Sequence, residues 1–145
     1  MTSKYREMKT RRKELTAQME PNSIALLAAA PPGTRNNDAE YQYRQSSDFY
    51  YLTGFTEQQA LLALIPGRKQ GEVVLFCQEK NKEKELWTGR LMGPDVACKE
   101  LQMDDAFPIA DIDDILPGLI EGRDRVYYSM GKDHQFDNRV MDWVN

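Results

Sequence analysis

Chemically reactive side chains are few and scattered in this chain of 145 residues. It has one histidine, His134, and no second histidine to complete a familiar zinc site, so we read His134 as a surface or capping residue. The two cysteines, Cys77 and Cys98, form no Cys-x-x-Cys motif, and we expect free thiols in a reducing compartment. The sequence also lacks a Gly-rich nucleotide-binding motif and a Gly-x-Ser-x-Gly nucleophile elbow. These residues therefore predict no catalytic or nucleotide-binding site within the chain.

A group of acidic residues in the last third of the chain could imitate a site for a hard cation. Its members are Asp104, Asp105, Asp111, Asp113 and Asp114. Their spacing does not match a calcium loop, and no glycine stands where such a loop must turn sharply. We therefore interpret these acids as a solvated face, and we predict no metal-dependent chemistry in the chain itself.

A long polar and aromatic segment, Arg35 to Phe55, is the stretch most suited to a functional role. It holds four of the seven tyrosines, together with two arginines and three acids. Such a connection inside a compact domain is usually either functional or disordered, and its aromatic residues argue against disorder. Ser47 and Asp48 fit the N-cap of a short helix over residues 48–52, and Gly54 fits the left-handed residue that ends it. The segment could also simply fasten a long loop to the core, and the residues alone leave both readings open.

The elements that must position these residues alternate between helices and strands. Apolar runs of strand length predict strands at residues 24–30, 60–65, 73–77, 85–88, 107–110 and 126–128. Helical spacing predicts helices at residues 3–19, 94–101 and 112–120, the last capped by Asp111, and a further helix after Gly131. The short polar connection between residues 65 and 73 predicts an antiparallel hairpin. We therefore predict one α/β domain, residues 1–145, with a mixed sheet of five to six strands and helices on both faces.

The overall charge is not that of a typical nucleic-acid-binding protein. The net charge is −4 and the pI is about 5.1, whereas a nucleic-acid-binding surface is normally basic. Six of the nineteen Lys and Arg residues lie between Lys4 and Lys13; we expect them on the solvated face of the first helix, with an anionic partner as the alternative. No secretory signal is visible, and the longest apolar run, Ile24 to Ala30, is too short to span a membrane. We therefore expect a cytoplasmic protein.

The tyrosine-rich segment carries a pattern that is specific at the level of a protein family. The pattern is Tyr41-x-Tyr43-Arg44-Gln45-x-Ser47-Asp48-Phe49-x-Tyr51-Leu52-Thr53-Gly54-Phe55, preceded by Arg35-x-x-Asp38 and followed by Ala60-Leu61-Leu62. It resembles the N-terminal domain of the Xaa-Pro aminopeptidases (aminopeptidase P), which belong to the creatinase and prolidase group. The similarity covers nearly the whole chain and implies the same α/β fold.

The resemblance implies that catalysis takes place elsewhere in a longer parent protein. In aminopeptidase P the active site lies in a C-terminal pita-bread domain, where two aspartates, a histidine and two glutamates bind a pair of divalent metals, usually manganese. The hydroxide that bridges the metals attacks the peptide bond before proline. Such a domain would follow Asn145. The resemblance therefore implies no catalytic and no metal-binding residue in this chain, which alone should be inactive.

The resemblance also implies roles for individual residues, because the family's N-terminal domain encloses the substrate and supplies oligomer contacts, often at a neighbouring subunit's active site. Asp38 resembles an acid in a polar network at the cleft, although a loop-bracing ion pair would explain it as well. Trp87 resembles an aromatic wall of the substrate pocket, where an indole packs against a proline ring; an ordinary core or interface tryptophan is the alternative. The other family positions are assigned to the structure of the loop: Arg35, Tyr41, Arg44, Gln45, Asp48 and Gly54.

Two other functions remain open from the sequence. The chain could be a complete binding or assembly module that keeps this fold without a catalytic half, and a partner would then cover its docking surface. The parent could instead be a prolidase-like dipeptidase or a creatinase-like hydrolase, because these enzymes share the domain. Under the leading reading, the expected partners are the chain's own catalytic domain, proline-containing peptides and further copies of the protein, and neither nucleic acid nor a membrane.

Overall fold

The computed structural model describes residues 3–30, 45–128 and 134–144, and in this part of the chain five strands form one sheet. The strands are β1 (Ser23–Ala28), β2 (Leu61–Leu64), β3 (Val73–Cys77), β4 (Asp105–Pro108) and β5 (Arg125–Tyr128). Their order across the sheet is β4-β3-β2-β1-β5. The β1–β2 and β2–β3 pairs are antiparallel, and the β3–β4 and β1–β5 pairs are parallel. The predicted mixed sheet and the predicted hairpin are therefore confirmed.

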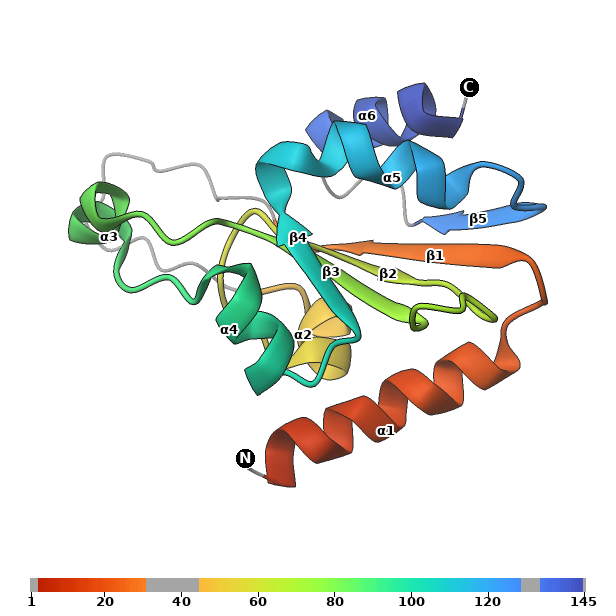
Figure 1. Ribbon diagram of the computed structural model, residues 1–145, viewed down its shortest axis with the longest axis horizontal. Coiled ribbons are helices and arrows are strands. Elements are labelled where there is room, and N and C mark those ends of the chain that lie inside the picture. Colours follow the sequence, from red (N-terminus) through yellow and green to blue (C-terminus); the bar gives the residue numbers. More distant parts are fainter. Residues whose placement is uncertain (1–2, 31–44, 129–133, 145) are drawn as a thin grey trace.

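Helices cover both faces of this sheet, as the sequence predicted (Figure 1). One face carries α1 (Ser3–Gln18), α2 (Ser47–Thr53) and α4 (Gly93–Glu100), and the other carries α5 (Ile112–Ile120) and α6 (His134–Val144). Alternate strand residues enter two separate cores. In β2, Leu62 and Leu64 belong to the core beneath α1, α2 and α4, whereas Leu61 and Ala63 belong to the core beneath α5 and α6. Burial on both faces explains why the central strands are continuous apolar runs.

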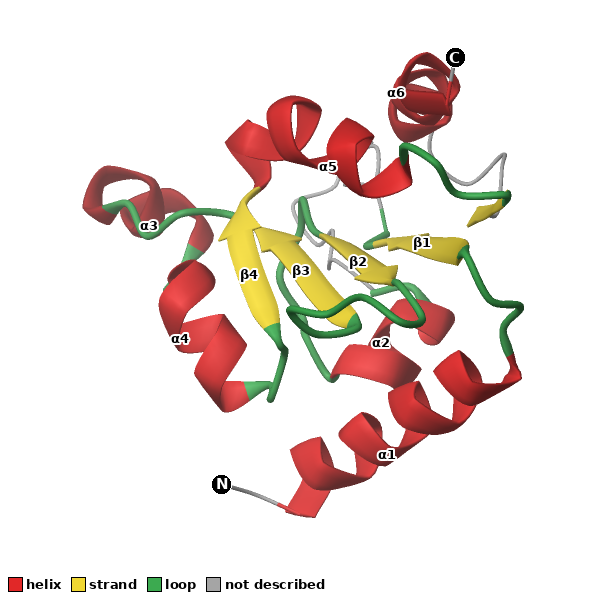
Figure 2. Ribbon diagram, turned by 45° about the vertical axis from the view of Figure 1, so that its right-hand side comes forward, coloured by secondary structure: helices red, strands yellow, loops and turns green. Residues whose placement is uncertain are grey.

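The predicted strand at residues 85–88 is wrong, because these residues belong to a helix, α3 (Lys82–Thr88). Asn81 caps this helix: its Oδ1 accepts hydrogen bonds from the backbone N–H groups of Glu83 at 3.0 Å and Lys84 at 3.2 Å. Capping and a run of good helix formers therefore outweigh the short apolar pattern that suggested a strand. In Figures 1 and 2, α3 stands away from the sheet.

The ends of two other helices differ from the predicted caps. The helix α2 begins at Ser47, with Ser46 in the N-cap position, so Ser47 and Asp48 lie in its first turn and do not precede it. Asp111 precedes α5 as predicted, but its side chain makes no capping hydrogen bond, because a single 3₁₀ turn over Ile109–Asp111 leads directly into the helix. None of the helices in the described residues is long and apolar enough to cross a membrane.

Gly54 ends α2 in the left-handed conformation, with φ of +70°. Its N–H donates to the carbonyl of Tyr50 at 2.8 Å. A Cβ atom at this position would lie 2.5 Å from Sδ of Met8 on α1, so a side chain would be both strained and obstructed. Glycine therefore allows α1 and α2 to approach closely.

Arg12 corrects the prediction that the basic residues of α1 all face solvent, because its side chain is buried, with 1% of its surface exposed. Its guanidinium donates to the carbonyl of Leu52 at 2.6 Å, and to those of Leu101 at 2.9 Å and Gln102 at 3.2 Å. These carbonyls lie at the C-terminal ends of α2 and α4, where helical carbonyls lack partners and carry partial negative charge. Burial lowers the pKa of Arg12 to about 10, while Asp104 opposes this, so the group stays charged at neutral pH.

We expect Arg12→Met to destabilise the chain by about 3 kcal/mol, because three carbonyls lose a charged donor in a buried place. Urea unfolding followed by circular dichroism measures this change. The matched control is Lys13→Met on the exposed side of the same helix, which should change the free energy of unfolding by less than about 0.5 kcal/mol. Equal unfolding midpoints for the two variants would contradict the assigned role of Arg12.

Candidate functional site

Four strands direct their carboxyl ends to the same edge of the sheet, because β1, β3, β4 and β5 run in one direction. In open α/β sheets, ligands bind in the crevice beyond these ends. Three described segments meet at this edge: residues 45–46, 54–60 and 78–92. Together they form the carboxyl edge, our candidate site, and α3 projects from it (Figure 1).

Gln45 connects the end of β1 with two of the three segments at the carboxyl edge. Its Oε1 accepts hydrogen bonds from the backbone N–H groups of Ala30 at 2.8 Å and Ser46 at 2.9 Å. Its Nε2 donates to the carbonyls of Phe55 at 3.3 Å and Glu57 at 3.1 Å. One amide therefore fastens the end of β1, the start of α2 and the connection to β2, which needs both a donor and an acceptor.

The structure describes the other predicted site residues only in part. Arg35, Asp38, Tyr41 and Arg44 lie outside the described residues. Asp48 is exposed in the first turn of α2.

The backbone of Trp87 belongs to α3, and its side chain is not among those described. The neighbouring Leu86 is 84% exposed, so α3 presents an apolar side chain to solvent at the carboxyl edge.

Two carboxylates that the sequence analysis did not single out hold the chain after α3. Oε2 of Glu57 accepts a hydrogen bond from the N–H of Met92 at 2.9 Å, and Oε1 of Glu85 accepts one from the N–H of Leu91 at 2.8 Å. Nζ of Lys80 lies 3.8 Å from Oε1 of Glu85. The hydrogen bond between Glu57 and Met92 joins residues 35 positions apart and uses a backbone N–H group, so no pattern of residue types in the sequence predicts it.

Glu57 is partly buried, and its Oε1 has no hydrogen-bond partner. Burial raises the pKa of Glu57 above its ordinary value; the bond from Met92 opposes this, and the negative charge of Glu85 adds to it.

Both cysteines are free thiols, as predicted, and their surroundings make them poor nucleophiles. Burial raises the pKa of Cys77 to about 12, and the nearby charge of Glu57 contributes. Burial also raises the pKa of Cys98, whose thiol donates to the carbonyl of Met103 at 3.3 Å. A thiol that keeps its proton at neutral pH is unreactive. The cysteines therefore act as core residues.

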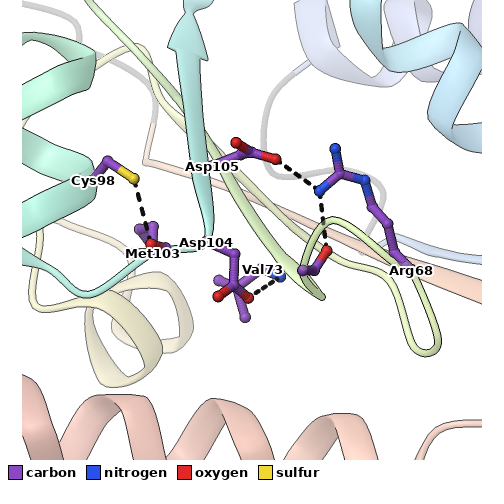
Figure 3. Close-up of polar contacts among 7 residues, drawn as sticks. Arg68, Val73, Cys98, Met103, Asp104 and Asp105 are labelled. Carbon is purple, nitrogen blue, oxygen red and sulfur yellow. Dashed lines mark hydrogen bonds and ion pairs between the residues drawn. The ribbon is translucent and has the colours of Figure 1, made fainter.

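Three of the five acidic residues of the last third make separate structural contacts. Asp105 pairs with Arg68 at 2.9 Å, and Oδ2 of Asp104 accepts from the N–H of Val73 at 3.1 Å, so both hold the β2–β3 connection against β4 (Figure 3). Asp113 accepts a hydrogen bond from Nε1 of Trp143 at 2.9 Å and thereby fastens α5 to α6. Among the described residues, no group of three or more His, Cys, Asp or Glu side chains is arranged to hold a metal ion.

A hollow of about 1110 Å³ lies beside the carboxyl edge, between α1, β1, β5 and the start of α2. Its lining is largely apolar and includes Leu15, Met19, Leu27 and Tyr127, with Asp48 near one end. Leu15 and Tyr127 are among the exposed large apolar side chains of the described residues. The hollow can accept an apolar group.

The chain matches the model of a known family. The family model described as "Aminopeptidase P, N-terminal domain" matches residues 8–127. The chain belongs to this family. The resemblance that the tyrosine-rich segment suggested is thereby confirmed.

Similar proteins are aminopeptidases of about three times this length. The Xaa-Pro aminopeptidase of Escherichia coli is 42% identical over 127 residues, which cover 87% of this chain and 29% of that protein. The structure of Pseudomonas aeruginosa aminopeptidase PepP has a TM-score of 0.91 and 62% identity, covering 97% of this chain and 32% of that one. The Escherichia coli enzyme has been solved in complex with substrate and, zinc-substituted, with product; each structure has a TM-score of 0.89 and 40% identity, covering 96% of this chain and 32% of that one.

We expect Glu57→Gln to stabilise the chain at neutral pH, because glutamine can accept the Met92 bond without a buried charge. The pKa of Glu57 is raised in the folded chain. Its stabilising contribution is therefore complete below its ordinary value of 4.5 and is lost as pH rises through the folded-state pKa. Thermal unfolding of the unsubstituted chain and of the variant measures this effect. The melting temperature of Glu57→Gln should be higher at neutral pH, and the difference should disappear below pH 4.5.

The control for this measurement is Glu79→Gln, which removes an exposed acid close to the end of β3. It should change the melting temperature little at any pH. A gain for Glu57→Gln that is the same at all pH values would show that the buried charge is not its cause.

Proposed function

We propose that this chain is the N-terminal, non-catalytic domain of a Xaa-Pro aminopeptidase, which releases the N-terminal residue that precedes proline. The observation that carries the proposal is the 42% identity to the Escherichia coli enzyme over 87% of this chain. The chain spans only 29% of that relative, so the catalytic residues of the proposed parent belong to the remainder.

The proposed parent holds its metals in that remainder, in a C-terminal pita-bread domain, and we propose manganese as the natural metal. Support comes from the zinc-substituted form of the Escherichia coli enzyme, whose name implies a replaceable metal. In keeping with such a division, four described acids contact backbone N–H groups or basic or indole side chains: Asp104, Asp105, Asp113 and Glu57. We propose a cytoplasmic location for the parent.

The proposed contribution of this domain is to complete the substrate pocket and to make oligomer contacts. The carboxyl edge suits this role, because α3 stands away from the sheet and exposes Leu86 beside Trp87. An apolar side chain on a projecting helix can meet another subunit without any movement of the core. Asp38 belongs to the same proposed pocket.

We expect the isolated chain of 145 residues to show no manganese-dependent hydrolysis of Xaa-Pro peptides, whereas the full-length parent should cleave them and lose activity to a chelator. The assay is release of the N-terminal residue, with the two proteins at equal concentration. Chelator-sensitive activity of the isolated chain would overturn the proposal. A reading frame without a further Asp, His and Glu set after codon 145 would instead favour a stand-alone assembly module.

We expect Trp87→Leu in the full-length parent to raise KM for Xaa-Pro peptides about tenfold, with a smaller change in kcat, because a flat wall of the pocket is lost. Steady-state kinetics measure both constants. Trp143→Leu is the matched control, since Trp143 lies on α6 and packs against α5 through Asp113. Unchanged KM and kcat for the Trp87 variant would show that Trp87 does not line the pocket, without contradicting the proposed activity of the parent.

A further inference from the structure

We propose that Glu57 is a positioning residue of the substrate pocket, which together with Glu85 holds residues 89–92 and thereby fixes α3, the helix that carries Trp87. The inference rests on the proposed function, because it takes α3 to face the substrate. Glu57 itself acts through Met92 and α3.

The described side chains of α3 supply little packing to hold the helix in place. Of its described side chains, Lys82, Glu83 and Leu86 are exposed, and Lys84 and Glu85 are only partly buried. Both views of the fold show α3 at a distance from the sheet (Figures 1 and 2). An element with few buried apolar contacts opens at low free energy unless its ends are fastened. The position of α3 therefore depends on the contacts at its two ends.

The end that follows Trp87 is fastened by the two carboxylates. Within α3, Glu85 accepts the N–H of Leu91, whose side chain is buried, and this bond closes the turn after the helix. Glu57, which lies in the connection between α2 and β2, accepts a hydrogen bond from the N–H of the next residue, Met92. Two adjacent N–H groups are thus held by side-chain carboxyl oxygens from two different segments.

Glu57 is itself fixed to the rest of the carboxyl edge. Its backbone carbonyl accepts a hydrogen bond from Nε2 of Gln45 at 3.1 Å, and Gln45 in turn binds the end of β1 through Ala30. A continuous series of contacts therefore runs from β1 through Gln45 and Glu57 to Met92 and α3. This series links the tyrosine-rich segment, where the family pattern lies, to the helix of Trp87.

Burying a negative charge on Glu57 costs free energy, and a neutral acceptor of the same hydrogen bond would avoid this cost. The groups that face it are Glu85 on α3, which repels it, and the thiol of Cys77 on β3; Lys80 pairs with Glu85. Oε1 remains buried without a partner. A glutamine would accept the same Met92 bond without this desolvation cost, so the stability of the chain alone does not call for a carboxyl group at position 57.

Hydrogen exchange on the 145-residue chain tests the hold on α3 directly. With Glu57→Ala, we expect the amides of residues 82–92 to exchange about tenfold faster or more, while those of α5 keep their rates. Glu57→Gln should restore most of the protection, because it can still accept the Met92 bond. The control Glu79→Ala removes an exposed acid from the same connection and should change nothing. Unchanged exchange in residues 82–92 of Glu57→Ala, or equal loss throughout the chain, would overturn the inference.

Kinetics of the full-length parent test the consequence for the pocket. Glu57→Ala should raise KM for Xaa-Pro peptides about tenfold with a smaller change in kcat, and Glu57→Gln should recover much of the loss. Faster exchange in α3 with unchanged KM would overturn the role in the pocket. If the wild-type parent cleaves no Xaa-Pro peptide, the proposed function fails, and the exchange measurement still decides whether Glu57 holds α3.

Discussion

The buried guanidinium of Arg12 ties one helical layer of the protein together, because it reaches from α1 to the C-terminal ends of both α2 and α4. Helical carbonyls at these ends have no partner inside their own helix and carry partial negative charge. A planar cation with five donors can satisfy carbonyls from two helices at once. The cation remains charged in spite of its burial, with its pKa lowered to about 10.

The position of the carboxyl edge follows from this packing. Arg12 and Gly54 fix α2 against α1, and α2 lies between the two segments that Gln45 joins. The connection to β2 then brings Glu57 to Met92 and so sets the place of α3. A projecting helix can hold a residue of a site in a fixed position when its hydrogen bonds connect it to a packed layer in this way.

Acidic residues show how strongly location decides the role of one residue type. Asp105 pairs with an arginine, Asp113 accepts from an indole, and Glu57 accepts from a backbone N–H in a place that raises its pKa. None of these roles is visible in composition or spacing. Asp105, Asp113 and Glu57 hold elements together, in a family whose similar enzymes are about three times longer.

The family, the mixed sheet and the two helical layers follow from the sequence, because a local pattern of residue types identifies a family and continuous apolar runs identify strands buried on both faces. Gly54 also follows from the sequence, since the left-handed end of a short helix is a local property. Three features emerge only in the folded chain: Arg12 is buried, residues 85–88 belong to a capped helix, and Glu57 binds Met92. These features depend on partners distant in the chain or on competition between local preferences, and a linear pattern contains neither.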